Sequence, residues 1–124
     1  MNLFVDDIRQ APPGWTLAKT ITQAQEILSN FHVEAVSLDH DIAYFDHMGM
    51  FTGKLHNENF SAVANFIAVM SEETRPKAVY VHTANPEGAR KIIGILHGKV
   101  KVIVRDYTFA HEWQNRERQI HEEV

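Results

Sequence analysis

The sequence has 124 residues, a net charge of −4 and no cysteine, and its length predicts a single domain over residues 1–124. These values exclude the broad basic surface of a duplex DNA binder, disulfide bonds and cysteine-bound zinc, while they allow a nucleotide or an RNA end as partner. The N-terminal segment reaches charged residues at Asp6-Asp7, unlike a signal peptide, and no apolar run approaches the roughly 20 residues that span a bilayer. We therefore expect a cytoplasmic protein without a membrane partner.

Two short apolar runs near the start of the chain end on acidic side chains. Leu3–Val5 leads into Asp6-Asp7, and Ala35–Leu38 leads into 39–41, as expected of buried parallel strands. Between them, Pro12-Pro13-Gly14 breaks the chain. A stripe of apolar residues with spacings of 4, 3, 4 and 3 then predicts a helix and consists of Leu17, Ile21, Ala24, Leu28 and Phe31.

The apolar pattern dissolves between Ile42 and Asn59, which predicts a long loop of the kind that is functional or disordered. A helical stripe follows from Phe60 to Met70, and then a third strand over Ala78–Val81. Asn85-Pro86 opens a further helix that Gly98 ends. The chain continues with a fourth strand over Val100–Val104 and a charged tail, 111–124, that could form a last helix.

The order of these elements predicts the fold class. Strands that alternate with helices favour an α/β three-layer sandwich, with a mainly parallel four-stranded sheet covered on both faces. Ligands of such sheets bind at the carboxyl ends of the strands. We therefore expect the segments that follow the first three strands to converge at one edge; these segments are Asp6-Asp7, Asp39-His40-Asp41 and His82-Thr83-Ala84-Asn85.

Carboxylates brought together at this edge repel one another, so either some of them are protonated or a cation neutralises them. The predicted metal ligands are Asp6, Asp7, Asp39 and Asp41. Such hard oxygen ligands suit Mg²⁺ or Mn²⁺, and a nearby histidine would widen the choice towards Fe or Zn²⁺. Taken singly, each of these acids could equally be a solvated strand end.

The segment after the third strand predicts a phosphate site. A strand that runs directly into a helix offers backbone amides and the helix dipole to an anion, and Thr83, Asn85 and Gly88 lie at this junction. Asn85-Pro86 alone could be no more than a good helix start. Arg9 and Arg105 are candidate phosphate ligands as well, although either arginine could instead pair with an aspartate.

Three motifs in combination resemble the cyclic-phosphate processing receiver-like domain, a relative of two-component receiver (flavodoxin-like) domains. They are Phe4-Val5-Asp6-Asp7-Ile8-Arg9 with Pro12 and Gly14-Trp15, Val36-Ser37-Leu38-Asp39-His40-Asp41 with Thr52-Gly53, and Val81-His82-Thr83-Ala84-Asn85-Pro86-Glu87-Gly88-Ala89. The resemblance implies that the first paired acids, Asp39 and Thr83 fill receiver positions. Arg105 stands where a receiver has lysine. Because the pattern predicts only one helix between the two acidic strands, we expect one strand-helix unit of a receiver to be missing there.

The resemblance and the residues together predict a metal-assisted hydrolase, a phosphodiesterase that opens a cyclic phosphate on a nucleotide or an RNA end. His40 or His82 would be the general base or acid beside Asp39 and Asp41, and a metal-free reaction using both histidines is the variant. The segment with Thr52-Gly53 could close as a lid. The alternatives are a receiver-type signalling module phosphorylated on Asp39 and a non-catalytic binder that sequesters a cyclic nucleotide.

Overall fold

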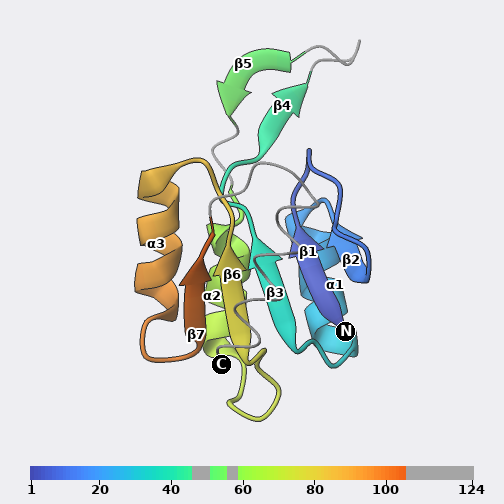
Figure 1. The fold of residues 1–124 in the computed structure, drawn as a ribbon, viewed down its shortest axis with the longest axis vertical. Coiled ribbons are helices and arrows are strands. Elements are labelled where there is room, and N and C mark those ends of the chain that lie inside the picture. Colours follow the sequence, from blue (N-terminus) through green and yellow to red (C-terminus); the bar gives the residue numbers. More distant parts are fainter. Residues whose placement is uncertain (46–50, 56–58, 106–124) are drawn as a thin grey trace.

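The computed structural model describes residues 1–45, 51–55 and 59–105. A parallel five-stranded sheet has the order β2-β1-β3-β6-β7 and forms the centre of the fold (Figure 1). Its strands are β1 (Asn2–Val5), β2 (Trp15–Ala18), β3 (Ala35–Leu38), β6 (Ala78–Val81) and β7 (Lys101–Val104). The described helices are α1 (Ile21–Asn30), α2 (Ser61–Val69) and α3 (Pro86–Leu96). The α/β receiver-like class is confirmed, with five strands in place of the four expected.

The additional strand is β2, which pairs in parallel with β1 from Asn2↔Trp15 to Val5↔Ala18. Leu17 was expected in a helix, but it lies in β2, and α1 begins only at Ile21. Thr20 is the N-cap of α1, because its side chain accepts a hydrogen bond from the Gln23 amide at 3.0 Å. Compared with a receiver, the chain therefore keeps the strand and lacks the helix between β1 and β2. The helical stripe also ends early, since Phe31 lies beyond α1 and is exposed.

The described helices all pack against one face of the sheet. Leu3, Val36 and Val79 are among the strand residues of this core, and Leu28, Ile67 and Ile92 contribute from α1, α2 and α3. The opposite face carries a second, smaller cluster made of Phe4, Ala35 and Tyr80, with Trp15, Leu17 and Ile103 packed against it. The helix predicted over 111–124 lies outside the described residues.

The segment expected to be a long loop contains a two-stranded antiparallel sheet of β4 (Ala43–Phe45) and β5 (Phe51–Leu55). This strand pair extends beyond the carboxyl ends of the main sheet (Figure 1). The expectation of a structureless loop is thus wrong for these two ranges. Within the described part of the chain, none of the helices has the length and apolar character needed to cross a bilayer.

Candidate active site at the carboxyl edge of the sheet

Four of the predicted site residues occupy one row, each a single residue beyond a strand. Their backbone amides extend the ladder: Asp6 donates to the Ala18 carbonyl at 3.1 Å, and Asp39 donates to the Val5 carbonyl at 3.1 Å. His82 and Arg105 donate likewise to Leu38 and Val81, at 3.1 and 2.8 Å. Because strand side chains alternate between faces, all four residues share the face of Phe4 and Tyr80.

His82 lies fully buried in the middle of this row, with both ring nitrogens engaged. Nε2 is 3.0 Å from Asp6 Oδ2, and Nδ1 is 2.6 Å from the Ser37 hydroxyl. The ring stacks on Phe4, with centroids 4.4 Å apart and planes 6° apart. An ionised carboxylate can only accept, so Nε2 carries the hydrogen that faces Asp6. The array Ser37–His82–Asp6 therefore orients the aspartate. Ser37 was not among the predicted site residues, although a polar residue within an apolar strand is a signal that could have identified it.

Asp6 is held as an anion. Burial raises the pKa of its carboxyl, but the hydrogen bond from His82 and those from the backbone amides of Arg9 and Ile8 outweigh burial and bring the pKa below its ordinary value. Both amides donate to Oδ1 at 2.9 Å. The Arg9 guanidinium reaches Oδ2 at 3.1 Å and extends to Asp39 Oδ2 at 3.3 Å. Arg9 thus bridges two of the predicted metal ligands.

Asp39 has the opposite electrostatic balance. Burial and the charge of Asp6 raise the pKa of the Asp39 carboxyl above its ordinary value, although His82, the His40 amide and Arg9 act against the rise. Among the described residues, Asp6, Asp7 and Asp39 present carboxylate oxygens that all lie within 4.8 Å of one another. This donor set fits a hard divalent cation. The group does not include Asp41, so the predicted set of four metal ligands is reduced to three.

Asp41 pairs instead with His40. His40 Nδ1 lies 2.8 Å from Asp41 Oδ1, and Asn85 Nδ2 donates to the same oxygen at 3.2 Å. His40 Nε2 is buried and has no hydrogen-bond partner among the described residues. The ring packs directly against Gly88, where an added Cβ would overlap Cγ of His40. Gly88 therefore leaves the space in which the imidazole of the His40–Asp41 dyad lies.

The start of α3 differs from the expected anion cradle. Asn85 Oδ1 accepts the amides of Glu87 and Gly88 at 3.1 and 3.2 Å, so these two amides are not free for a phosphate. The Thr83 oxygen accepts the Asn85 amide at 3.1 Å, which leaves the Thr83 hydroxyl hydrogen to donate. Arg105 is buried, with its guanidinium carbon 5.6 Å from the centroid of the Tyr80 ring.

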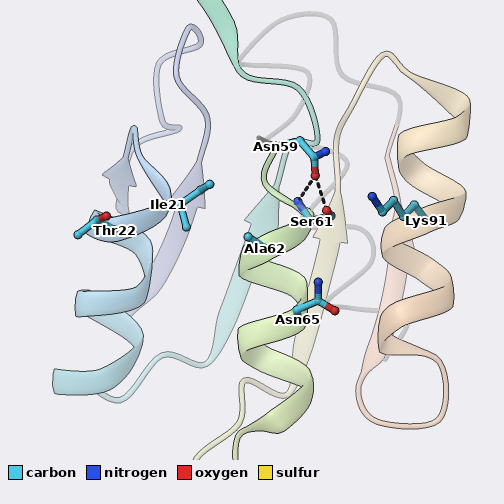
Figure 2. A pocket seen from close by; sticks show the side chains of 7 residues that line it. All are labelled: Ile21, Thr22, Asn59, Ser61, Ala62, Asn65 and Lys91. Carbon is cyan, nitrogen blue, oxygen red and sulfur yellow. Dashed lines mark hydrogen bonds between the residues drawn. The ribbon is translucent and has the colours of Figure 1, made fainter. Parts of the chain in front are cut away.

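A separate pocket of about 510 Å³ lies on the helical face of the molecule (Figure 2). It is lined by α1, α2 and α3, with Thr22, Asn65 and Lys91 among its side chains. Asn59 Oδ1 accepts the Ser61 amide at 2.9 Å at one end of this pocket. None of the predicted site residues lines it. The aspartates and histidines therefore form a site of their own at the edge of the sheet.

Comparison with known proteins agrees with this arrangement. A family model described as the cyclic-phosphate processing receiver domain matches residues 1–98. The match runs from β1 through α3 and contains every candidate site residue except Arg105. None of the curated proteins compared matches the chain significantly. With its parallel five-stranded sheet and its acidic carboxyl edge, the chain belongs to the family of cyclic-phosphate processing receiver domains.

Proposed function

We propose that the domain is a phosphodiesterase that hydrolyses a cyclic phosphate on a nucleotide or an RNA end. The observation that carries the proposal is the pairing of His40 with Asp41 in the segment that begins with Asp39, whose carboxylate lies in one cluster with those of Asp6 and Asp7. A histidine oriented by an aspartate is the usual arrangement of a general base or acid. In this role, substrate binding must expose the buried Nε2 of His40 to water. A receiver that only accepts a phosphoryl group on aspartate does not need this dyad.

Hydrolysis of a cyclic phosphate breaks one phosphorus–oxygen ester bond as water adds to phosphorus. In the proposed reaction, His40 Nε2 takes the proton from water and can return it to the leaving oxygen. Asp41 holds the ring through Nδ1, and Asn85 holds Asp41. His82 is assigned to positioning, because both of its nitrogens are already engaged with Ser37 and Asp6.

The remaining groups neutralise the phosphate. A divalent cation, if bound by Asp6, Asp7 and Asp39, supplies positive charge to the phosphate oxygens. Arg9 adds a guanidinium at the same edge, and the Thr83 hydroxyl can donate one hydrogen bond. The proposed anion site thus consists of side chains, since the first amides of α3 are occupied by Asn85.

The proposal is tested by incubating the protein with cyclic mononucleotides, cyclic dinucleotides and RNA that ends in a 2′,3′-cyclic phosphate, with Mn²⁺ or with a chelator. We expect a linear phosphomonoester product, detected by liquid chromatography and mass spectrometry. His40→Gln should lower the rate by about 10²–10⁴-fold, the usual contribution of a general acid or base. His97→Gln makes the same change at an exposed position at the other end of α3 and should leave the rate unchanged. Equal rates in the two variants would contradict the role of His40.

The same samples separate the two alternative functions. A phosphorylated signalling module would gain a covalent phosphoryl group on Asp39 after incubation with acetyl phosphate, which intact-protein mass spectrometry detects. A sequestering protein would release its cyclic nucleotide unaltered. Either result without hydrolysis by the wild-type protein overturns the proposed reaction.

Gly88→Ala is expected to lower the hydrolysis rate by about a hundredfold, the effect of a small misplacement of a reacting group. An added methyl group would overlap Cγ and Nδ1 of His40, so the ring must move away from Asp41. Gly94→Ala is the matched control, because it lies in the same helix and its added Cβ meets no atom within 4 Å. That control should retain activity and gain up to about 1 kcal/mol of stability from helix propensity. Full activity of Gly88→Ala would show that His40 does not need its present position.

A further inference from the structure

Arg9 contacts the same two carboxylate oxygens that a divalent cation would need. Its Nη1 lies 3.1 Å from Asp6 Oδ2 and 3.3 Å from Asp39 Oδ2. Divalent cations such as Mg²⁺ bind carboxylate oxygens at about 2.0–2.1 Å and require their lone pairs. A guanidinium nitrogen between the two oxygens occupies that space, so Arg9 and a shared cation exclude each other there.

The second carboxylate oxygen of Asp6 does not offer a way around Arg9. Asp6 Oδ1 already accepts the backbone amides of Ile8 and Arg9, both at 2.9 Å. Asp39 Oδ1 accepts the His40 amide at 2.8 Å. A cation bound to Asp6 must therefore use Oδ2, the oxygen that both Arg9 and His82 Nε2 contact.

Arg9 is also placed so that it can leave. Its side chain is 29% exposed, whereas the side chains of Asp6 and Asp39 are 0% and 7% exposed. Arg9 is thus the most exposed of the three side chains, and the two carboxylates lie deeper than its guanidinium. Its backbone amide stays bound to Asp6 Oδ1, so a displaced Arg9 remains tethered at the mouth of the site.

We infer that Arg9 is an exchangeable internal cation. It neutralises Asp6 and Asp39 when no divalent ion is bound, and it is displaced by such an ion to bind an oxygen of the substrate phosphate. Guanidinium is suited to both partners, since it forms the same paired hydrogen bonds with carboxylate and with phosphate. This inference rests on the proposed function, because it assigns the metal and the phosphate to that same site.

The exchange has a thermodynamic consequence. Arg9 competes with the divalent ion, so it weakens binding of the metal alone. A phosphate that captures the displaced guanidinium removes this competition, and linkage requires each ligand to strengthen the binding of the other. Metal and phosphate should therefore bind cooperatively through one side chain.

The test measures Mn²⁺ binding by electron paramagnetic resonance, with and without inorganic phosphate. Without phosphate, Arg9→Gln should bind Mn²⁺ at least about fivefold more tightly than the wild type, within the usual range of coupling between sites. Phosphate should tighten Mn²⁺ binding to the wild type and have a smaller effect on Arg9→Gln. Arg90→Gln removes the same charge at an exposed position of α3 and should behave as the wild type. Unchanged or weaker binding in Arg9→Gln overturns the exchange.

A measurement on the wild type keeps the inference testable if Arg9→Gln does not fold. The Nε–H resonance of Arg9 should shift when Mg²⁺ is added and shift again with inorganic phosphate, whereas that of Arg90 should not. An Arg9 signal unaffected by saturating Mg²⁺ overturns the inference. The two proposals can fail separately. If the protein does not bind Mn²⁺, the exchange is wrong, but metal-free hydrolysis through His40 remains possible. If Arg9 exchanges with the cation but no cyclic phosphate is hydrolysed, the exchange is supported and the proposed enzymatic function is wrong.

Discussion

His82→Ala should lower the free energy of unfolding at pH 7 by about 3–5 kcal/mol, as expected when a fully buried aromatic ring is truncated to alanine. The side chain is fully buried. Among its contacts are the carboxylate of Asp6, the hydroxyl of Ser37 and the ring of Phe4. Its loss takes a hydrogen bond from the carboxylate of Asp6 and leaves the Ser37 hydroxyl without its partner. It also opens a cavity over the ring of Phe4.

Urea denaturation with an unchanged m-value would measure this loss as a change in stability. Ser37→Ala removes one arm of the array and should cost about 1 kcal/mol, the net value of a single hydrogen bond. The exposed His97 provides the control, since His97→Ala should stay within about 0.5 kcal/mol of the wild type. If His82→Ala lost less than Ser37→Ala, the buried array would not be a stabilising unit.

The fold could be predicted where a segment carries its own signal. Short apolar runs that end on acids identify β1 and β3, and Asn85-Pro86 identifies the start of α3. Strand β2 does not carry such a signal, because Ala18 is its only fully buried residue. Leu17 also stands four residues before Ile21, so a half-exposed edge strand fits the helical spacing by coincidence.

For the site, the sequence predicts where the residues lie but not how their side chains pair. Parallel topology places Asp6, Asp39 and His82 at one edge, and this follows from the sequence. Which histidine keeps a free nitrogen depends on side-chain contacts between segments far apart in the chain. The occupied amides of α3 were foreseeable, since an N-cap residue such as Asn85 accepts the same amides that would bind an anion.

Asp39→Asn should abolish most of the turnover and yet stabilise the fold. The turnover should fall by about 10²-fold or more, since the variant loses a carboxylate ligand of the divalent cation that would neutralise the phosphate. Burial and the charge of Asp6 raise the pKa of the Asp39 carboxyl above its ordinary value of 3.8, so the ionised form is disfavoured in the folded protein. At pH 7 the substitution removes this unfavourable charge and should add about 0.5–2 kcal/mol, a common gain when a functional site is relieved of strain.

The change in stability caused by Asp39→Asn should depend on pH, and the direction of the pKa shift sets the sign of that dependence. A carboxyl whose folded pKa is raised contributes stability below its unfolded value, here 3.8, and that stability is lost as the pH rises through the folded pKa. The gain of Asp39→Asn should therefore be present at neutral pH and disappear below pH 3.8.

Asp6→Asn is the matched variant with the opposite sign. The pKa of the Asp6 carboxyl is lowered overall, because the hydrogen bonds from His82 and two backbone amides outweigh burial. Its contribution to stability is present above 3.8 and is lost as the pH falls through the folded pKa. Urea denaturation at neutral and acid pH should thus show Asp6→Asn less stable than the wild type at pH 7 and Asp39→Asn more stable. Destabilisation of both variants at neutral pH would contradict this prediction. It would mean that the ionised carboxylate of Asp39 stabilises the fold, as that of Asp6 does.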